Sequence, residues 1–363
     1  MKWGFLFFML LPIVGHVYVM WHIFRLVPIA IPLRWLSVLL LTGVFFSLFA
    51  GFGGLYERMP LWAATATYEV TTSWVFILLY LFMLFLLLDL GRLIHLVPTS
   101  LLKNSWPGTA LVTVVMVAVF AFGNWKYNHK VRVPLQLTTQ KAIGRPLRLV
   151  MLSDLHLGYH NRRHELARWI DFIRAEKPDL VLIAGDIIDN STRPLVEEGS
   201  AEELKRLGVP IVACLGNHEK YAGEPSAMRF YRDAGITLLH DSVLDWDSLQ
   251  IVGRDDRSNP RRKPLAKLMS DVNKEKYIIV LDHQPYKLDE AERAGVDFQL
   301  SGHTHRGQVW PISWITDALY ECSWGMCQRG NTRYYISSGL GIWGGKFRIG
   351  SQSEYVVATV EHK

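Results

Sequence analysis

Four long apolar stretches dominate the first third of the chain, whereas short apolar runs alternate with polar segments in the rest. The stretches cover residues 3–24, 35–56, 70–88 and 104–125. Each has about the 20 residues that a helix needs to cross the ~30 Å hydrocarbon layer of a membrane. A signal peptide is the alternative for the first stretch, but it lacks a short apolar core with a small-residue cleavage site, and three more stretches follow. The pattern predicts an all-α bundle of about four transmembrane helices over residues 1–125.

After residue 147 the apolar runs are rich in Val, Ile, Leu and Tyr and are bounded by turn residues, as strands are. The expected strands cover residues 148–153, 179–185, 209–216, 277–282, 297–301 and 333–338. Residues 162–177 have apolar positions at helical spacing and predict an amphipathic helix. Strands that alternate with helices indicate an α/β domain around a buried sheet, here over residues 148–363. A polar connector over residues 126–147 is expected to join it to the helical bundle.

Charge is distributed unevenly between these two parts. The first 125 residues hold six of the 39 basic and three of the 33 acidic residues, so the remainder is nearly balanced. The formal net charge of +6 comes from no Lys- or Arg-rich block of the kind that marks an electrostatic footprint for nucleic acid. The expected partner is therefore the lipid bilayer, and no nucleic-acid partner is expected.

Side chains that can bind metal ions follow five of the predicted strands. In chain order the motifs are Asp154-Leu-His156, Gly185-Asp186-Ile-Ile-Asp189, Gly216-Asn217-His218-Glu219, Asp282-His283 and Gly302-His303-Thr-His305. Ligands bind outside the carboxyl ends of the strands in open α/β sheets, so we expect these loops to converge. Imidazoles and carboxylates together can hold two divalent ions roughly 3.5–4 Å apart, which polarise a phosphoryl oxygen and supply hydroxide. The sequence therefore predicts a single cluster of metal ligands.

These motifs, in this order, resemble the calcineurin-like metallophosphoesterase family, and within it a branch that includes membrane-attached enzymes of bacterial envelopes. The resemblance covers roughly residues 148–360 and implies a four-layer α/β/β/α sandwich with two divalent ions, for which Mn, Fe, Zn and Mg are candidates. It implies that one ion is bound by Asp154, His156 and His305. The other ion would be bound by Asn217, His283 and His303. Asp186 would bridge the two ions.

The resemblance also implies a catalytic residue. His218 would not bind metal but would face the phosphate and either protonate the leaving oxygen or stabilise its charge. Asp189 and Glu219 stand beside ligands and are predicted to orient them rather than to bind metal. No substrate-binding residue can be assigned from the sequence. Arg254 and Arg257 are candidates for a phosphate contact, against the alternative of a solvated loop.

The leading hypothesis is a membrane-anchored two-metal hydrolase that cleaves a phosphoester or pyrophosphate bond in a lipid-linked or other envelope substrate. A nucleotide or nucleic-acid phosphodiesterase is the first alternative, because the same metals could do that work. A membrane sensor or transporter with a phosphoesterase-like ligand-binding domain is the second. Apolar stretches without charged interiors make a poor solute pathway, and the complete ligand set argues against a domain that only binds.

The sequence also predicts where the catalytic domain lies. Four spans would put both chain ends on one side, with cationic residues in the two loops on the other side: Arg25, Arg34, Arg92 and Lys103. Cationic loops face the cytoplasm, so we expect an integral protein of a bacterial plasma membrane with an extracytoplasmic catalytic domain. Cys322 and Cys327 could form a disulfide there.

Only about twenty residues separate Trp125 from the first catalytic strand, so the domain must stay near the bilayer. We therefore expect an amphiphilic phosphoester as substrate, with its phosphate at the metals and its apolar part toward the membrane. The segment 312–324 places apolar and aromatic side chains just after the Gly-His-Thr-His motif. Core packing, a membrane dock and an acyl-chain groove are its alternative roles.

Overall fold

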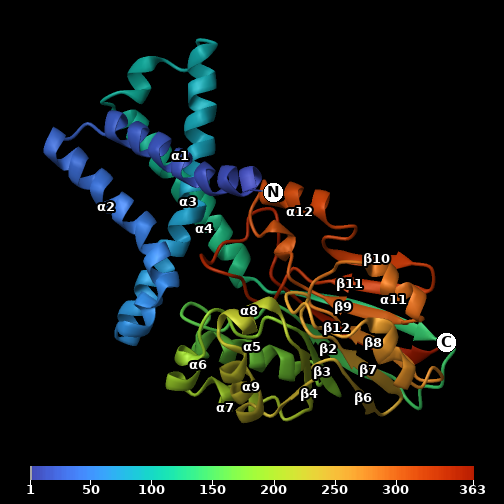
Figure 1. Ribbon diagram of the computed structural model, residues 1–363. Coiled ribbons are helices and arrows are strands. Elements are labelled where there is room, and N and C mark those ends of the chain that lie inside the picture. Colours follow the sequence, from blue (N-terminus) through green and yellow to red (C-terminus); the bar gives the residue numbers. More distant parts are fainter. Residues whose placement is uncertain (1) are drawn as a thin grey trace. The chain divides into compact units, whose positions relative to one another are not determined.

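The computed structural model describes residues 2–363, without the side chains of residues 2–10 and of Phe52, and divides the chain into two compact units (Figure 1). The first unit comprises the chain up to Asn124 together with the short segment 344–346. The second comprises residues 125–343 and 347–363 and is called the catalytic unit below.

The first unit is built from long helices. They are α1 (Lys2–Leu26), α2 (Ile31–Ala50), α3 (Leu61–Leu93) and α4 (Trp106–Asn128), with short turns η1 (Gly51–Leu55), η2 (Tyr56–Arg58) and η3 (Thr99–Leu102). By length and composition, α2, α3 and α4 are apolar enough to cross a membrane. The helix α1 is not among these three, and its first side chains lie outside the described residues. Four helices are thus observed where four were predicted, three of them with the properties of membrane spans.

The catalytic unit contains two six-stranded sheets. The first has the order β1-β12-β2-β3-β4-β5 and the second β10-β11-β9-β8-β7-β6. The strands of the first are β1 (Val131–Thr139), β2 (Leu147–Leu152), β3 (Leu180–Ala184), β4 (Ile211–Cys214), β5 (Ile236–Leu238) and β12 (Glu354–His362). Those of the second are β6 (Ser242–Trp246), β7 (Leu249–Gly253), β8 (Tyr277–Leu281), β9 (Phe298–Ser301), β10 (Gly325–Arg329) and β11 (Thr332–Ile336).

Helices cover the outer faces of both sheets. The helices of this unit are α5 (Arg163–Ala175), α6 (Arg193–Glu198), α7 (Ser200–Lys205), α8 (Asn217–Tyr221), α9 (Glu224–Asp233), α10 (Leu265–Leu268), α11 (Leu288–Ala294) and α12 (Ile312–Leu319), with the 3-10 turns η4 (Met269–Asp271) and η5 (His305–Gly307). One apolar cluster joins α5 and α9 to the first sheet, and another joins α10 and α11 to the second. A third cluster, which includes Met151, Leu182 and Ile279, contains residues of both sheets. The four-layer α/β/β/α sandwich is therefore confirmed.

The central strands are continuous apolar runs because both of their faces are covered. All five residues of β3 and all five of β8 are buried. Parallel sheets in α/β proteins have this property, since helices or a second sheet cover each face. β2, β3 and β4 run parallel to one another, and so do β7, β8 and β9. The carboxyl ends of the strands of each set therefore lie at one edge of their sheet.

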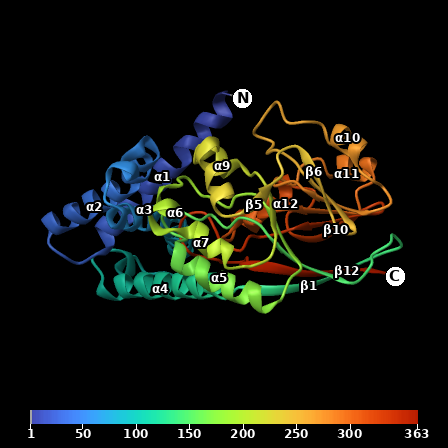
Figure 2. The same ribbon diagram turned by 90° about the horizontal axis from the view of Figure 1, so that it is seen from below.

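Part of the segment expected to connect the two domains is strand β1. It pairs in parallel with β12 over nine residues, from Val131 to Thr139, and the two strands lie side by side in Figure 2. The exposure of its residues alternates along most of its length, and Pro134 lies within it. Proline cannot donate a backbone hydrogen bond and is tolerated on edge strands, which is the place of β1 in the sheet. Two residues, His129 and Lys130, separate α4 from β1.

Candidate metal centre

All five motif loops follow the carboxyl ends of strands, as the sequence predicted. Asp154 and His156 follow β2, Asp186 and Asp189 follow β3, Asn217, His218 and Glu219 follow β4, His283 follows β8, and His303 and His305 follow β9. Among the described residues, the His and carboxylate side chains of these loops form three groups with the spacing of metal ligands. The two sheets therefore bring together residues that are up to 151 positions apart in the chain.

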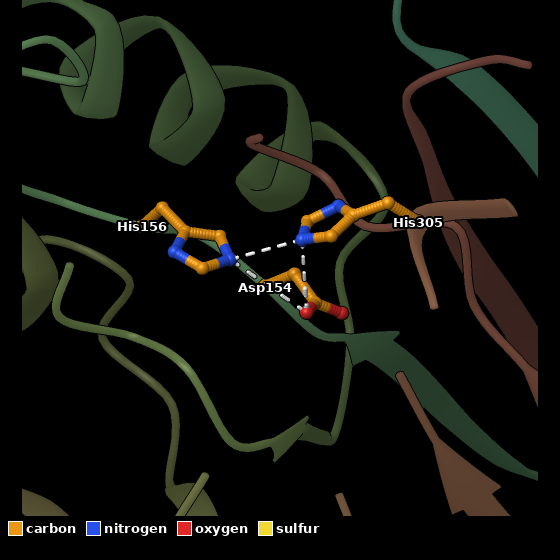
Figure 3. A group of neighbouring side chains, drawn as sticks. All are labelled: Asp154, His156 and His305. Atoms are coloured by element: carbon orange, nitrogen blue, oxygen red, sulfur yellow. Dashed lines mark hydrogen bonds and ion pairs between the residues drawn. The ribbon is translucent and has the colours of Figure 1, made fainter. Parts of the chain in front are cut away.

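The first group contains Asp154, His156 and His305 (Figure 3). The Nε2 atoms of the two imidazoles face each other at 3.0 Å. They lie 3.7 Å and 3.4 Å from Oδ1 of Asp154. Three ligand atoms that converge on a common point in this way match the coordination that divalent transition metals take from imidazole and carboxylate.

The second group contains Asp186, His283 and His303. Nε2 of His283 lies 3.0 Å from Oδ2 of Asp186, while Nδ1 of His283 donates to the carbonyl of Ala184 at 2.7 Å. A proton fixed on Nδ1 leaves the lone pair of Nε2 free for a metal ion. Oδ2 of Asp186 is also 3.7 Å from Nε2 of His156, so this carboxylate lies between the two groups. That is the place of a bridging ligand.

Asn217 is the remaining residue that the sequence analysis predicts as a ligand with this group. Its side chain is buried, and its Oδ1 has no hydrogen-bond partner among the described residues. Buried polar atoms almost always have partners, so an unsatisfied carbonyl oxygen beside this cluster calls for one. The seven predicted ligands, which include this unsatisfied oxygen, have the chemistry to hold divalent ions.

The carboxylates of Asp189 and Glu219 hold the ligand loops in place but belong to neither of these two ligand groups. Oδ1 of Asp189 lies 3.2 Å from Nδ1 of His156 and 3.2 Å from Nδ1 of His218. Glu219 accepts the backbone N–H groups of Gly216, Asp186 and Ile188 at 2.7, 3.2 and 3.1 Å. Groups of this kind fix the tautomer and the orientation of metal ligands. Asp189, His156 and His218 form the third group with the spacing of metal ligands, and it shares His156 with the first group.

His218 stands at the edge of the cluster, with its ring packed edge-on against His156 at 4.5 Å between centroids. Its backbone N–H donates to Oδ1 of Asp186 at 2.9 Å. In the described structure its ring contacts Asp189 through Nδ1, at 3.2 Å from the carboxylate and 3.3 Å from the backbone carbonyl. Nε2 thus remains for contact with a substrate.

The backbone of the ligand loops is strained. Asp154, His156, Asp186, His303 and His305 all have φ between 45° and 70°. Such left-handed conformations cost of order 1–3 kcal/mol each for residues other than glycine and cluster at functional sites. Gly216 permits the close approach of two loops, because a Cβ atom there would lie 2.1 Å from Oδ1 of Asp186.

Burial controls the protonation of the imidazoles. It lowers the pKa of His303 to about 4 and that of His305 to about 3. Burial also acts to lower the pKa of His156, but hydrogen bonds to Asp154 and Asp189 outweigh it and raise that pKa to about 10. His303 and His305 are therefore neutral at pH 7, which is the form that binds metal.

Some residues of the site were missed by the sequence analysis. Arg348 is fully buried, and its guanidinium donates to the carbonyls of His305, Ser338 and Gly341 at 2.9, 2.5 and 2.8 Å. It joins the loop of His305 to the loop that follows β11. No motif in the sequence marks this arginine. Its contact with the carbonyl of His305, 43 residues away in the chain, can be found only from the fold.

The expectation of a solvated loop fails for one of the two candidate arginines. Arg254 is buried, with Nη1 2.8 Å from Asp282 and 3.2 Å from Glu290, so its charge is already paired. Arg257 is exposed and stacks on the ring of Tyr286 at 3.8 Å. Tyr286 in turn donates to the hydroxyl of Tyr320, whose ring lies 6.4 Å from that of His303. A line of aromatic side chains therefore leads from the second group of ligands to Arg257.

Comparison with known proteins gives the family. Residues 147–307 match the family model of calcineurin-like phosphoesterases. An uncharacterized metallophosphoesterase of Campylobacter jejuni is 31% identical over 227 residues, which are 61% of this chain and 61% of that protein. A transmembrane protein with metallophosphoesterase domain from Danio rerio is 29% identical over 331 residues, 83% of this chain and 74% of the relative. An uncharacterized metallophosphoesterase of Aquifex aeolicus is 29% identical over 230 residues, 61% of this chain and 87% of the relative.

The matched segment contains every predicted ligand, since the first is Asp154 and the last is His305. The catalytic unit of this chain therefore contains a calcineurin-like phosphoesterase domain over residues 147–307, and the relatives that it resembles are named metallophosphoesterases.

Proposed function

We propose that this chain is a membrane-anchored two-metal hydrolase that cleaves a phosphoester or pyrophosphate bond in a lipid-linked substrate. The observation that carries the proposal is the position of Asp186 between two groups of buried ligand atoms, 3.7 Å from His156 and 3.0 Å from His283. A carboxylate in this position suits two ions rather than one. Mn, Fe, Zn and Mg remain the candidates, because mixed imidazole and carboxylate ligands suit several metals.

Two bound ions would polarise a phosphoryl oxygen and activate water for in-line attack. The side chains of this chain do the rest. His218 donates a proton from Nε2 to the leaving oxygen, while Asp189 holds Nδ1 and stabilises the protonated ring. Glu219 and Arg348 keep the loops of Asp186 and His305 in place through backbone hydrogen bonds.

The membrane helices favour a lipid-linked substrate over a soluble nucleotide. Three helices have the length and apolarity of membrane spans, and the Danio rerio relative, whose match covers 83% of this chain, is named a transmembrane protein. Since two residues separate α4 from β1, the catalytic unit is tethered closely to the bilayer. A tether raises the effective concentration of a lipid head group at the site, whereas a soluble nucleotide gains nothing from it.

Full-length protein in liposomes is expected to hydrolyse a bilayer-embedded lipid phosphoester with at least ~10²-fold higher efficiency than a short-chain, water-soluble analogue with the same head group. A screen against envelope lipid extracts, with products identified by mass, would supply the head group. Brisk hydrolysis of soluble nucleotides without turnover of any lipid would contradict the lipid proposal and favour the nucleotide alternative.

We also infer that the catalytic unit lies outside the cytoplasm of a bacterial plasma membrane. A disulfide joins Cys322 to Cys327 in the segment between α12 and β10, and Cys214 is a buried free thiol. Disulfides persist in oxidising compartments and are rare in the cytosol.

In the Cys214→Ser variant, a membrane-impermeant maleimide is expected to label intact cells only after treatment with an impermeant reductant. The signal should disappear in Cys214→Ser/Cys322→Ser/Cys327→Ser, which serves as the control. Free thiols that are protected in intact cells and react only after lysis would place the catalytic unit in the cytoplasm.

A further inference from the structure

Helix α12 (Ile312–Leu319) presents an apolar face that the described residues leave largely exposed. The exposed fractions are 64% for Trp314, 57% for Ile315 and 66% for Leu319. Trp310, just before the helix, is 41% exposed, and its ring meets that of Trp314 edge-on with 5.2 Å between centroids. Ile315 and Leu319 are neighbours one turn apart, and Trp314 lies beside Ile315, so the three side chains occupy about 140° of the helix circumference. Ser313, by contrast, is buried.

This concentration of apolar side chains is peculiar to one segment of the catalytic unit. Its described residues include eight exposed large hydrophobic side chains. They are Trp125, Val196, Tyr221, Trp310, Trp314, Ile315, Leu319 and Met326. Four of the eight belong to the ten residues from Trp310 to Leu319, so the patch is local and is not a general property of the surface. Local apolar patches on a soluble surface mark interaction sites.

The helix is fastened to the loop that carries two of the candidate metal ligands. A Cβ atom on Gly307 would lie 2.4 Å from the backbone nitrogen of Ser313, so η5 and the start of α12 pack backbone to backbone. The N–H of Trp310 donates to the carbonyl of Ile349 at 2.6 Å. After the helix, the hydroxyl of Thr304 donates to the carbonyl of Ser323 at 2.6 Å. Whatever holds α12 therefore also holds the loop of His303 and His305.

The chain itself indicates what covers this face. Two residues between α4 and β1 can extend over no more than ~7 Å, so the catalytic unit follows directly on a helix with the length and apolarity of a membrane span. Tryptophan is enriched at the boundary between lipid and water, where its ring is apolar and its N–H meets water. Short amphipathic helices with Trp and Leu on one face lie in that boundary.

We propose that α12 and Trp310 form a lipid-contacting anchor that seats the metal centre at the surface of the bilayer. The helix is ~12 Å long, and the chain from His305 to Ile312 can extend over at most ~25 Å. The candidate ligand His305 therefore stays within head-group distance of the lipid surface. The role of this short distance in catalysis rests on the proposed lipid substrate, whereas the contact between α12 and lipid does not.

An environment-sensitive fluorophore on Ile315→Cys tests the contact directly, in full-length protein reconstituted into liposomes. The introduced thiol can be labelled selectively because Cys322 and Cys327 are bonded and Cys214 is buried. We expect its emission to shift to the blue, to be quenched by nitroxide-labelled lipid and to be protected from aqueous iodide. Val196→Cys, at a side chain that is 69% exposed on α6, is the matched control and should be quenched by iodide only.

Quenching by iodide at position 315 to the same extent as at position 196 would overturn the proposal. Protection from both quenchers would overturn it too, because the face would then be covered by protein, either a second copy of the chain or a partner. If lipid quenches the probe but the protein hydrolyses no lipid, the anchor is supported and only the proposed lipid substrate fails.

Turnover provides a second readout. The variant Trp314→Ser/Ile315→Ser/Leu319→Ser is expected to lose about tenfold or more of its turnover of a bilayer-embedded lipid phosphoester, because membrane binding scales with buried apolar area. Hydrolysis of a soluble chromogenic phosphodiester should stay within about twofold of that of the parent protein, since none of the three side chains belongs to the ligand groups. Val196→Ser should change neither rate. Equal loss on both substrates would assign α12 a structural role and overturn the anchor.

Discussion

Replacing Asp186 with alanine is expected to remove both metal ions and to lower turnover by at least ~10² to 10³-fold, the cost of deleting one group that stabilises charge in a transition state. The reason is geometric. Oδ2 of Asp186 lies 3.0 Å from His283 of one ligand group and 3.7 Å from His156 of the other, so no other carboxylate can replace it in both. Elemental analysis of the purified protein, together with hydrolysis of a chromogenic phosphodiester, measures both effects.

Asp171→Ala is the matched control for this experiment. Asp171 is a carboxylate on α5 whose side chain is 62% exposed and pairs only with Arg206 in the described structure. This control should keep two ions and full activity. An Asp186→Ala protein with one tightly bound ion would show that the carboxylate serves a single metal, and full activity would refute the two-metal proposal.

The second large effect is expected for His218→Ala, which should keep its metal ions while turnover falls by ~10² to 10⁴, the usual range for a positioned general acid. Its ring contacts Asp189 through Nδ1 and joins neither of the two proposed ligand groups. The loss should be greater for a substrate with an alkyl leaving group than for one that releases nitrophenolate, because a stabilised phenolate needs less protonation.

His164→Ala, an exposed histidine on α5, should behave as the parent protein in the same assays. A His218→Ala protein that loses metal along with activity would make this histidine a ligand. An equal loss with both leaving groups would mean that His218 stabilises the phosphate rather than protonating the departing oxygen.

The sequence was most informative where a function needs residues close together in the chain. Asp154 and His156, or His303 and His305, are two positions apart and directly follow strands, so their meeting could be foreseen from the rule that carboxyl ends of parallel strands share an edge. The four layers could be foreseen for a similar reason, since fully apolar runs such as Leu180–Ala184 must be covered on both faces.

Features that depend on distant contacts could not be foreseen. Arg348 has no local signal, because the carbonyls that it contacts become neighbours only in the folded unit. Strand β1 has apolar residues at alternate positions from Val131 to Leu137, but the proline within it argues against a strand, which forms here at the sheet edge by pairing with β12. The apolar residues of α12 would suit a core equally well, so only the structure reveals that Trp314 and Leu319 are exposed.

The place of β12 in the first sheet also determines when the catalytic unit can finish folding during its synthesis. β12 follows the other eleven strands in chain order, yet it lies between β1 and β2. At the usual 5–20 residues per second of a ribosome, roughly 10–40 s pass between the synthesis of β2 and that of β12. During this interval β1 and β2 have unpaired edges, which invite pairing with other chains. The yield of active protein is therefore expected to depend on protection of these two strands during biogenesis, by the membrane insertion machinery or by a chaperone.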